Sequence, residues 1–515
     1  MTVTVWVPGD SGALALGAEA TARRLTETLR ATGRDVRIRR NGSRGMYWLE
    51  PLVEVDCNGV RIGYGPVHAR DVEGLVAGGM LSGAPHPLCL GPIDRHEWLR
   101  SQQRLTFARV GVTEPCDLDD YLAHGGYRGL RRALELGPRA TVKAVTDSGL
   151  RGRGGAAFPT GVKWQTVLDQ PAGEKFVACN ADEGDSGTYA DRMLMEGDPY
   201  ALIEGMTIAG VATDARTGYV YLRVEYPHAY RTFAAAIERA RARGYLGDDV
   251  CGSGKSFDID LRLGAGAYIC GEETSMLESL EGKRGEVRVR PPLPAHKGLF
   301  GAPTVVNNVV TLATVPFILA EGADAYRNHG EANSRGTQPL QLAGNIRRAG
   351  LVERAFGLTL RELLYDYGGG SASGRPLRAV QIGGPLGAFV PAPHFDTSIE
   401  YESLAGIGAM LGHGGVVAFD DAADMLQMAR HALEFCAGES CGKCAPCRLG
   451  SVRGAEALDR VARGVDAKRN LEIVEGICDT MTHASLCGLG GMAPAPVLSA
   501  MKHFGEDFRS RRTGG

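Results

Sequence analysis

Three cysteines spaced three residues apart could hold a metal cluster near the carboxyl end of the sequence. Cys441, Cys444 and Cys447 form a CxxCxxC run, and Cys487 follows 40 residues after the last of them. Three thiolates in such a run can hold one corner of an iron–sulfur cluster, and a remote fourth thiolate completes the coordination. The pattern predicts a [4Fe–4S] cluster.

Two other metal sites fit part of this pattern. Tetrahedral zinc uses thiolates too, but its ligands usually come as separated pairs. Cys436, Cys441 and Cys444 have the C-x4-C-x2-C spacing of a plant-type [2Fe–2S] centre, although Cys436 falls on the apolar face of an expected helix and is more simply a buried cysteine. Cys478 is the nearest rival of Cys487 as the fourth ligand.

A glycine-rich segment at 149–164 could bind a phosphate or a flat ring. Its glycines lack a Cβ, so backbone N–H groups can approach a ligand, and Arg153 and Lys163 add positive charge. Taken alone, this GxGxxA pattern is weak, because it equally describes a loop and follows no clear strand.

Two polar clusters follow expected strands. Residues 179–188 come after the apolar run 176–179, and their amide and carboxylate side chains suit ribityl and ribose hydroxyls, although a solvated acidic turn would have the same composition. Residues 264–274 come after the strand at 257–263 and lead into a helix at 273–280, whose amino end can face a phosphate.

The composition limits the classes of function. A length of 515 residues exceeds what one core usually serves, and a net charge of -3 gives no basic surface for nucleic acid. The longest apolar stretch, at 309–320, is shorter than the roughly 20 residues that span a bilayer. No export signal is recognised at the amino terminus, and twelve cysteines in a chain of this length favour metal ligands over disulfides. We therefore expect a cytoplasmic protein that binds neither nucleic acid nor a membrane.

The hydrophobic pattern predicts a multidomain α/β and α protein. An α/β unit with a first strand at 2–7 occupies residues 1–110, and strands alternate with helices in 111–334. Short strand-like runs cut by Gly and Pro indicate a β-rich module at 335–418. Apolar residues at helical spacing from 420 onward predict a helical bundle at 419–515.

Taken together and in this order, these clusters resemble the family of NADH-oxidising flavoprotein subunits of respiratory complex I. The resemblance covers roughly residues 118–495 and is carried by residues 149–164, 179–192, 264–284, 291–294, 307–308 and 439–448. The family includes diaphorase subunits of NAD-linked hydrogenases and of cytoplasmic molybdenum or tungsten formate dehydrogenases. It implies FMN, NAD(H) and one [4Fe–4S] cluster, with the four cysteines as cluster ligands. It also implies a Rossmann-like FMN and NADH domain, a β-grasp module and a terminal four-helix bundle.

The resemblance also assigns cofactor contacts, residue by residue. The FMN contacts it implies are Gly152, Arg153, Gly154, Lys163, Asn180, Asp182, Gly271, Glu272, Asn307 and Asn308. The residues implied around NAD(H) are Gly155, Phe158, Glu183, Asp185 and Glu273. The sequence departs from the usual pattern at Ala157, where Gly is common, at Asp185, where Glu is common, and at Thr166 and Leu293, where Phe is frequent. The last two changes affect the stacking expected for adenine.

The amino-terminal extension resembles the thioredoxin-like ferredoxin domain that is fused to this flavoprotein in soluble members. Versions that bind a cluster have C-x-G-x-C where Ser43 and Tyr47 stand here, and hydroxyl groups cannot replace two thiolates. A fused domain without a cluster is most similar to the β subunit of NAD-dependent formate dehydrogenase. That resemblance implies two partners, a molybdenum-containing catalytic subunit with iron–sulfur clusters and a small [2Fe–2S] thioredoxin-like subunit.

The chemistry follows from the cofactors. Nicotinamide exchanges a hydride and a cluster accepts single electrons, so a flavin is needed between them and no side-chain acid or base is required. Two carboxylates beside the expected ribose, Glu183 and Asp185, predict a preference for NAD over NADP. The alternatives are the diaphorase of a hydrogenase, the complex I subunit, and a flavin-free electron relay or scaffold.

Overall fold

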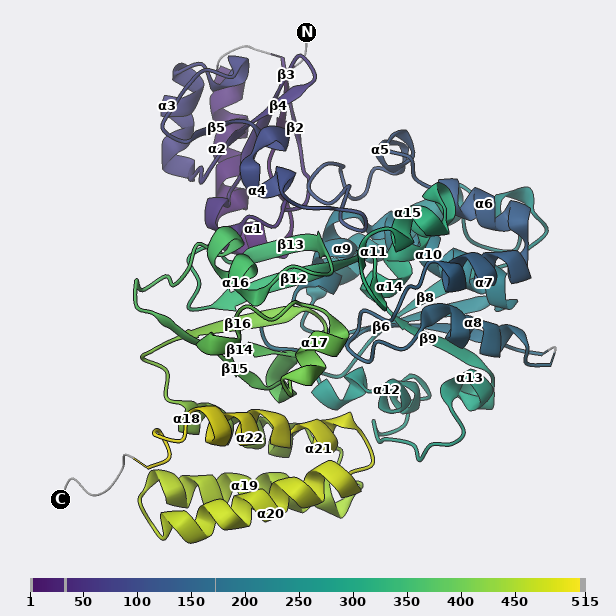
Figure 1. Ribbon diagram of the computed structural model, residues 1–515. Coiled ribbons are helices and arrows are strands. Elements are labelled where there is room, and N and C mark those ends of the chain that lie inside the picture. Colours follow the sequence, from purple (N-terminus) through teal and green to yellow (C-terminus); the bar gives the residue numbers. More distant parts are fainter. Residues whose placement is uncertain (1–2, 32–34, 172, 510–515) are drawn as a thin grey trace.

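The computed structural model describes residues 3–31, 35–171 and 173–509. Figure 1 shows the amino-terminal sheet at one end and the carboxyl-terminal helices at the other. A second five-stranded sheet lies between them, and a parallel sheet with its helices lies beside it. Three of the four expected regions therefore contain a sheet and the fourth is helical.

The amino-terminal region is a five-stranded sheet covered by helices. Its strand order is β2-β1-β3-β4-β5. The strands are β1 (Val3–Trp6), β2 (Val36–Arg39), β3 (Val53–Cys57), β4 (Val60–Tyr64) and β5 (Cys89–Pro92), and α2 (Ala18–Ala31) packs with α3 (Val72–Ala77). Leu25 and Leu29 of α2 meet Val5 and Val55 of the sheet in one apolar core. The strand expected at 2–7 is thus present, with residue 2 outside the described residues.

The parallel sheet positions the polar clusters found in the sequence. Its order is β8-β7-β6-β9, with β6 (Phe176–Ala181), β7 (Thr217–Leu222), β8 (Asp258–Leu263) and β9 (Thr304–Asn308). Helices α10 (Pro199–Thr213) and α14 (Val309–Glu321) are almost entirely buried, as their apolar sequences require. Asn180 pairs with Asn308 in the register of β6 and β9, so both asparagines lie at the carboxyl edge of the sheet, where ligands usually bind.

The second five-stranded sheet follows in the chain. It has the order β13-β12-β16-β14-β15, and β12 and β16 are its parallel pair. Its strands are β12 (Thr337–Gly344), β13 (Gly350–Ala355), β14 (Leu377–Ile382), β15 (Phe389–Pro391) and β16 (Gly415–Asp420). A hairpin of β10 (Gly330–Glu331) and β11 (Ser334–Arg335) crosses the expected boundary at 334, and the domain boundaries stay predictions.

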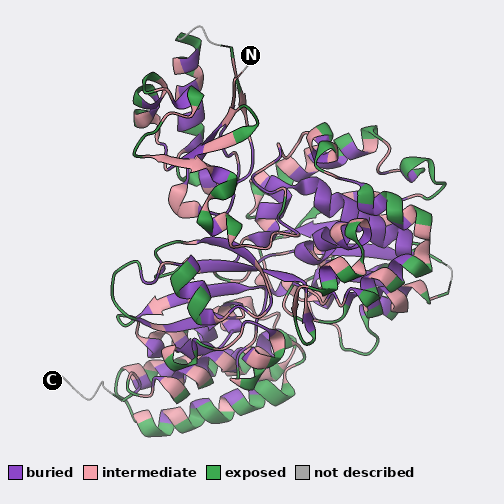
Figure 2. Cartoon of the chain, turned by 45° about the horizontal axis from the view of Figure 1, so that its top comes forward, coloured by how far each residue is buried: buried purple, intermediate pink, exposed green. Residues whose placement is uncertain are grey.

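The chain ends in packed helices that present the cysteines. They are α18 (Met425–Glu439), α19 (Ala445–Ala462), α20 (Ala467–Ala484), α21 (Gly488–Met492) and α22 (Pro494–His503). Figure 2 shows that the outer face of these helices is exposed, whereas the parallel-sheet region is largely buried. Among the described residues, no helix combines the length and the apolar character that crossing a bilayer requires.

Candidate functional site

A cavity of about 680 Å³ opens at the carboxyl edge of the parallel sheet. Its walls come from the parallel-sheet region, from the loop 410–413 before β16 and from residues 488–492 of the terminal helices. The sequence-predicted residues that line it are Gly152, Gly154, Gly155, Phe158, Lys163, Asn180, Asp182, Glu183, Asp185, Gly271, Glu272, Glu273, Asn307 and Asn308. Its volume is in the usual range for ligand sites, about 300–1,000 Å³.

The glycine-rich loop forms one wall because it has no side chains there. A Cβ on Gly154 would lie 2.8 Å from the Cβ of Asn308, and Gly155 has a φ of +106°. Ala157, the position where Gly is common, also adopts a positive φ, +53°. Lys163, on α8 (Thr160–Leu168), reaches the cavity and donates to the carbonyl oxygen of Val306 at 2.8 Å. The loop thus leaves room for a ligand beside a cation, although the N–H groups of Gly152 and Arg153 donate to Phe158 and Thr311 inside the protein.

The position of Arg153 differs from the one that the sequence predicts, in which its charge faces the ligand. Arg153 is 1% exposed, and its guanidinium group donates to the hydroxyls of Tyr326 at 2.7 Å and Tyr401 at 3.0 Å, with backbone carbonyls as further acceptors. Arg153 therefore ties the glycine loop to the second five-stranded sheet and does not supply positive charge to the cavity. Five donors in a fixed fork suit this multidentate role inside the protein.

Two acidic side chains in the cavity wall have oxygens that the described residues do not satisfy. Asp182 Oδ2 and Glu272 Oε1 are buried and accept no hydrogen bond from the described residues, although Glu272 Oε1 lies 3.8 Å from Arg290 Nη2 in an ion pair. Burial raises the pKa of Asp182 to about 7. A buried polar atom without a partner costs roughly 1–3 kcal/mol. A ligand rich in hydroxyl groups, such as the ribityl chain of FMN or a ribose, would satisfy both atoms, so this wall fits the cofactors.

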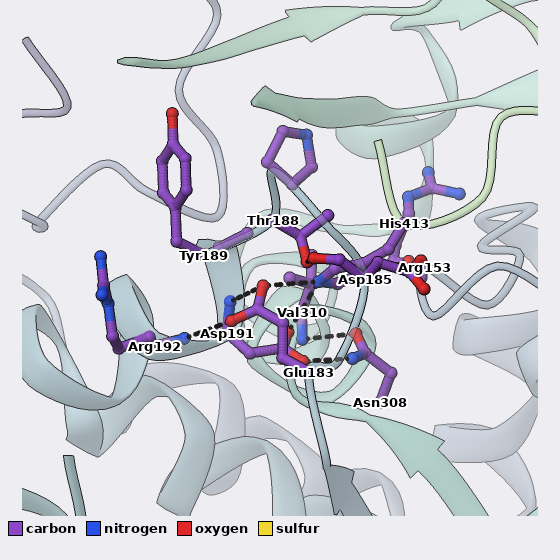
Figure 3. A network of polar contacts seen from close by, with 12 residues as sticks. Arg153, Glu183, Asp185, Thr188, Tyr189, Asp191, Arg192, Asn308, Val310 and His413 are labelled. Atoms are coloured by element: carbon purple, nitrogen blue, oxygen red, sulfur yellow. Dashed lines mark hydrogen bonds and ion pairs between the residues drawn. The ribbon is translucent and has the colours of Figure 1, made fainter. Parts of the chain in front are cut away.

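Glu183 lines the cavity, but its carboxylate is committed to the protein. Oε1 accepts from the backbone N–H of Asp191 at 3.1 Å and faces His413 Nε2 at 3.1 Å, and Oε2 accepts from the N–H of Arg192 at 3.1 Å (Figure 3). Oε2 also accepts from the hydroxyl of Tyr226 at 3.1 Å. A carboxylate offers about four acceptor sites. These four contacts occupy them, so the expected hydrogen bond from a ribose hydroxyl finds no free acceptor on Glu183. Whether Glu183 contacts NAD(H) in another way stays a prediction.

Asp185 is likewise held inside the wall. Its Oδ1 accepts from the hydroxyl of Tyr268 at 2.8 Å, and burial raises its pKa. Asn180 orders the opposite wall by donating to the carbonyl oxygen of Gly271 at 2.8 Å. These contacts preorganise the cavity before any ligand binds.

Among the residues that sequence reasoning missed and that the fold brings to this cavity are Tyr268, Asp191 and His413. Asp191 stands in the first turn of α9 (Ala190–Gly197), where an acidic residue usually only complements the helix dipole. His413 is more than 200 residues from its carboxylate partners in the chain. The glycines on both sides of His413 were the one local signal that could have found it.

The four cysteines meet at one end of the terminal helices. Cys444 precedes α19, Cys447 lies in its first turn, and Cys487 precedes α21, while Cys441 lies in the loop after α18. Cys447 lies in the apolar cluster of these helices and the other three cysteines pack against that cluster. A Cβ on Gly490 would lie 2.7 Å from Cys447 Cβ, which places the start of α21 against α19. The fold therefore joins the remote Cys487 to the CxxCxxC run.

The spacing of the sulfurs favours a cluster over a single zinc ion. A zinc ion with Zn–S bonds of about 2.3 Å needs thiolates about 4 Å apart. Within the described residues, no three cysteine sulfurs lie within 4.8 Å of one another. Cys436 is buried on α18 with its Sγ 3.9 Å from that of Cys447, and Cys478 is buried within α20.

The cysteine site and the cavity share a wall. Gly488 and Leu489, which directly follow Cys487 in the chain, line the cavity. The loop of the cysteine run is also tied to the parallel-sheet region, since Lys443 Nζ donates to the carbonyl oxygen of Val287 at 2.7 Å and Tyr268 N donates to Glu439 at 2.9 Å. A cofactor in the cavity would therefore lie beside the cluster.

Comparisons with known proteins agree with this geometry. The model of the Nuo51 FMN-binding domain matches residues 145–317, and that of the NADH-ubiquinone oxidoreductase-F iron-sulfur binding region matches residues 427–511. The NADP-reducing hydrogenase subunit HndC of Solidesulfovibrio fructosivorans is 44% identical over 80% of this chain and 84% of its own length. A subunit of the NADH-quinone oxidoreductase of Escherichia coli is 41% identical over 79% of this chain and 92% of its own length.

A solved structure extends the similarity to the amino-terminal sheet. A chain of the NAD+-reducing [NiFe]-hydrogenase in the H2-reduced state matches with a TM-score of 0.70 and 30% identity, covering 100% of this chain and 84% of that one. The cavity wall and the cysteine site fit the cofactors of such proteins. The chain therefore belongs to the family of NADH-oxidising flavoprotein subunits of complex I and NAD-reducing hydrogenases, and its cofactors are FMN, NAD(H) and one [4Fe–4S] cluster.

Proposed function

We propose that this chain is the diaphorase subunit of an NAD-dependent formate dehydrogenase, in which formate and NAD+ yield CO2 and NADH. The observation that carries the diaphorase part is the wall that Gly488 and Leu489 share between the cavity and Cys487. A chain that only relayed electrons or served as a scaffold would have no need for a cavity of about 680 Å³ at that wall.

The residues of the chain position both cofactors. Gly152, Gly154 and Lys163 would face the phosphate and ring of FMN, Asn180, Asp182 and Gly271 its ribityl chain, and Glu272, Asn307 and Asn308 would complete that site. Gly155, Phe158, Asp185 and Glu273 would border NAD(H). Bound FMN supplies the conversion between hydride transfer and single-electron transfer. Lys163 stays oriented through Val306 and through Glu273, whose Oε2 lies 3.5 Å from Nζ.

The formate assignment rests on the amino-terminal region. Ser43 and Tyr47 stand where a thioredoxin-like ferredoxin domain would carry cluster ligands, and this fused, cluster-free domain resembles formate dehydrogenase β subunits. We propose the same partners as for that β subunit, a molybdenum-containing catalytic subunit with iron–sulfur clusters and a small [2Fe–2S] thioredoxin-like subunit. The second sheet would be a β-grasp module and the terminal helices a four-helix bundle. The twelve cysteines support a cytoplasmic location.

A second candidate is the diaphorase of an NAD-linked hydrogenase. It is supported by the solved hydrogenase chain, whose similarity covers all of this chain, whereas the complex I relative from Escherichia coli covers 79% of it. The two candidates differ only in which partner supplies the electrons.

The experiment is purification of the native complex, followed by metal analysis and assays with formate and with hydrogen. Molybdenum and formate-dependent NAD reduction are expected, whereas nickel with hydrogen-dependent reduction would replace the formate proposal by the hydrogenase one. Flavin absorbance and NADH oxidation with an artificial acceptor test the diaphorase role in the chain itself. A chain that contains iron but binds no flavin would be a relay or scaffold.

A further inference from the structure

His413 joins three segments behind the cavity. It stands in the loop between α17 (Tyr401–Gly406) and β16, it is 5% exposed, and both of its ring nitrogens have partners (Figure 3). Nδ1 lies 2.7 Å from the carbonyl oxygen of Arg153, in the glycine loop. Nε2 lies 3.1 Å from Glu183 Oε1 and 3.2 Å from Asp191 Oδ1.

These contacts determine how many protons the ring carries. A carbonyl oxygen can only accept a hydrogen bond, so Nδ1 must carry a hydrogen. Ionised carboxylates also only accept, so Nε2 must carry one as well. A ring with hydrogens on both nitrogens is an imidazolium cation. Burial alone would lower the pKa of His413, but the carboxylates of Asp191 and Glu183 raise it well above its usual value.

The charges around this cation are few. Glu183 follows β6 and Asp191 begins α9, and Asp185, in the turn between them, is the third carboxyl group that faces His413. Among the described residues, His413 is the only partner with which Glu183 or Asp191 forms an ion pair. The guanidinium of Arg153 is turned to Tyr326 and Tyr401. The group formed by Glu183, Asp191 and His413 therefore carries one net negative charge.

The backbone around His413 is fixed as well. Gln341, on β12, donates to the carbonyl oxygen of His413 at 2.9 Å and accepts from the N–H of Ala190 at 2.7 Å. A Cβ on Gly155 would lie 3.6 Å from Gly412, so the glycine loop rests on the loop of His413. Asp191 in turn accepts from Asn308 Nδ2 at 2.7 Å. One imidazole thus connects the glycine loop, the start of α9 and the second sheet.

We propose that His413 is a positioning residue for the flavin, held as an imidazolium between the Arg153 carbonyl and the carboxylates of Glu183 and Asp191. It keeps the glycine loop in place and offsets one of the two negative charges of Glu183 and Asp191. Without the cation, those two charges would oppose the addition of electrons to a neighbouring flavin, because Coulomb interactions are strong where water is excluded. This inference rests on FMN occupying the cavity.

The experiment varies the charge of this group in the purified full chain. His413→Gln keeps a donor toward the carboxylates and changes the group's net charge from one negative charge to two, whereas Asp191→Asn changes it to zero. The double variant restores one negative charge. We expect the flavin midpoint potential to fall in His413→Gln and to rise in Asp191→Asn. Each shift should correspond to a tenfold change in the equilibrium constant for flavin reduction, which is about 30 mV for a two-electron couple. The double variant should return close to the wild-type potential.

A matched control separates charge from positioning. Gln341→Leu loosens the same loop without changing any charge, so FMN affinity should weaken while the potential of the bound flavin stays unchanged. His413→Gln should weaken FMN binding and also shift the potential. Unfolding of the flavin-free chain provides a readout that does not depend on activity, and both variants should lower its midpoint.

Three results would overturn the proposal. The first is a wild-type potential in both His413→Gln and Asp191→Asn, and the second is an equal shift in Gln341→Leu. The third is a stoichiometric metal ion beyond the four irons that disappears in Asp191→Asn, since Glu183, Asp191 and His413 have ligand atoms within 4.8 Å of one another. If His413→Gln does not fold, the rise of the flavin midpoint potential in Asp191→Asn still tests whether the charge of this group acts on the flavin. A wild-type chain without flavin would instead refute the FMN site, so the two failures are distinguishable.

Discussion

Helix α9 contacts two buried polar regions that look alike in the sequence and differ in the structure. At its start, Asp191 faces the cavity, and near its end Glu196 accepts from the N–H of Ser11 at 2.7 Å and from its hydroxyl at 2.6 Å. In the same amino-terminal region Ser43 donates to Glu50 Oε1 at 2.6 Å, and the N–H of Leu52 donates to Oε2 at 2.8 Å. The protein supplies the partners of Glu50 and Glu196 itself.

The cavity side of the helix is different. Asp182 and Glu272 each keep a buried oxygen that accepts no hydrogen bond from the described residues. Buried polar groups are nearly always paired in native proteins. Unsatisfied oxygens in the wall of a cavity mark a place for a ligand. The amino-terminal region also holds buried atoms without a hydrogen-bond partner, such as Asp10 Oδ1 and the Tyr47 hydroxyl, but these atoms do not line the cavity. The amino-terminal region thus contacts α9 through polar groups, such as Ser11 with Glu196, while cofactors complete the cavity.

The largest effect should come from the cluster, which shares a wall with the cavity. Cys487→Ser is expected to abolish the [4Fe–4S] cluster, because a hydroxyl is a poor substitute for the fourth thiolate. Iron content and the absorbance of the cluster measure the loss. Cys478→Ser, at a cysteine buried within α20, is the control and should keep all four irons. Loss of the cluster in both variants would contradict the assignment of Cys487.

The next effect concerns the cavity alone. Gly154→Ala should weaken FMN binding about tenfold or more, because its Cβ would lie 2.8 Å from Asn308 Cβ and overpacking costs roughly 1–3 kcal/mol. FMN affinity is measured by flavin fluorescence. Gly74→Ala, on α3 in open space, should leave the affinity unchanged. Normal FMN affinity in Gly154→Ala would show that this wall does not contact the flavin.

The buried polar groups of the amino-terminal region should make its stability depend on pH. Burial, together with the carboxyl group of Asp10, raises the pKa of Glu50 from 4.5 to about 8. The folded state therefore keeps a proton that the unfolded state loses between these values, so this contribution to stability is complete below pH 4.5 and is lost as the pH rises through 8. Glu50→Gln should remove that dependence.

We expect the unfolding midpoint of the amino-terminal region to be about 4 °C higher in Glu50→Gln than in the wild type at pH 8.5, since 1 kcal/mol shifts a domain of this size by about 4–8 °C. The difference should shrink toward pH 5. Thermal unfolding followed across this pH range measures it, and flavin and iron content should not change. A cofactor loss in this variant would mean that the two regions are not separate.

The smallest effect is expected at Glu183, where the sequence alone predicts a gain with NADPH of about tenfold in Glu183→Gln. Since the carboxylate already accepts from four groups, we expect instead that the ratio of kcat/KM for NADH and NADPH changes by less than about threefold, or about 0.7 kcal/mol. Steady-state kinetics with both dinucleotides provide the ratio. A tenfold change would restore Glu183 as the residue that selects NAD.

Several features could be predicted from the sequence because they are local. Strands β6 and β8 were expected close to their observed positions, and so were the glycine loop and the terminal helices, since periodicity and glycine are properties of short segments. The carboxyl ends of parallel strands share one edge, and the register of β6 and β9 places Asn180 beside Asn308. That both contact FMN stays a prediction.

The sequence by itself determined which groups are available, namely four thiols at cluster spacing, a loop without side chains and carboxylates after a strand. Only the tertiary structure decided what those groups face. Arg153 turned away from the cavity because tyrosine hydroxyls and carbonyls offer it more acceptors, and Glu183 was occupied by His413, 230 residues away in the chain. Side-chain direction and pairing depend on residues remote in sequence, and no local spacing encodes them.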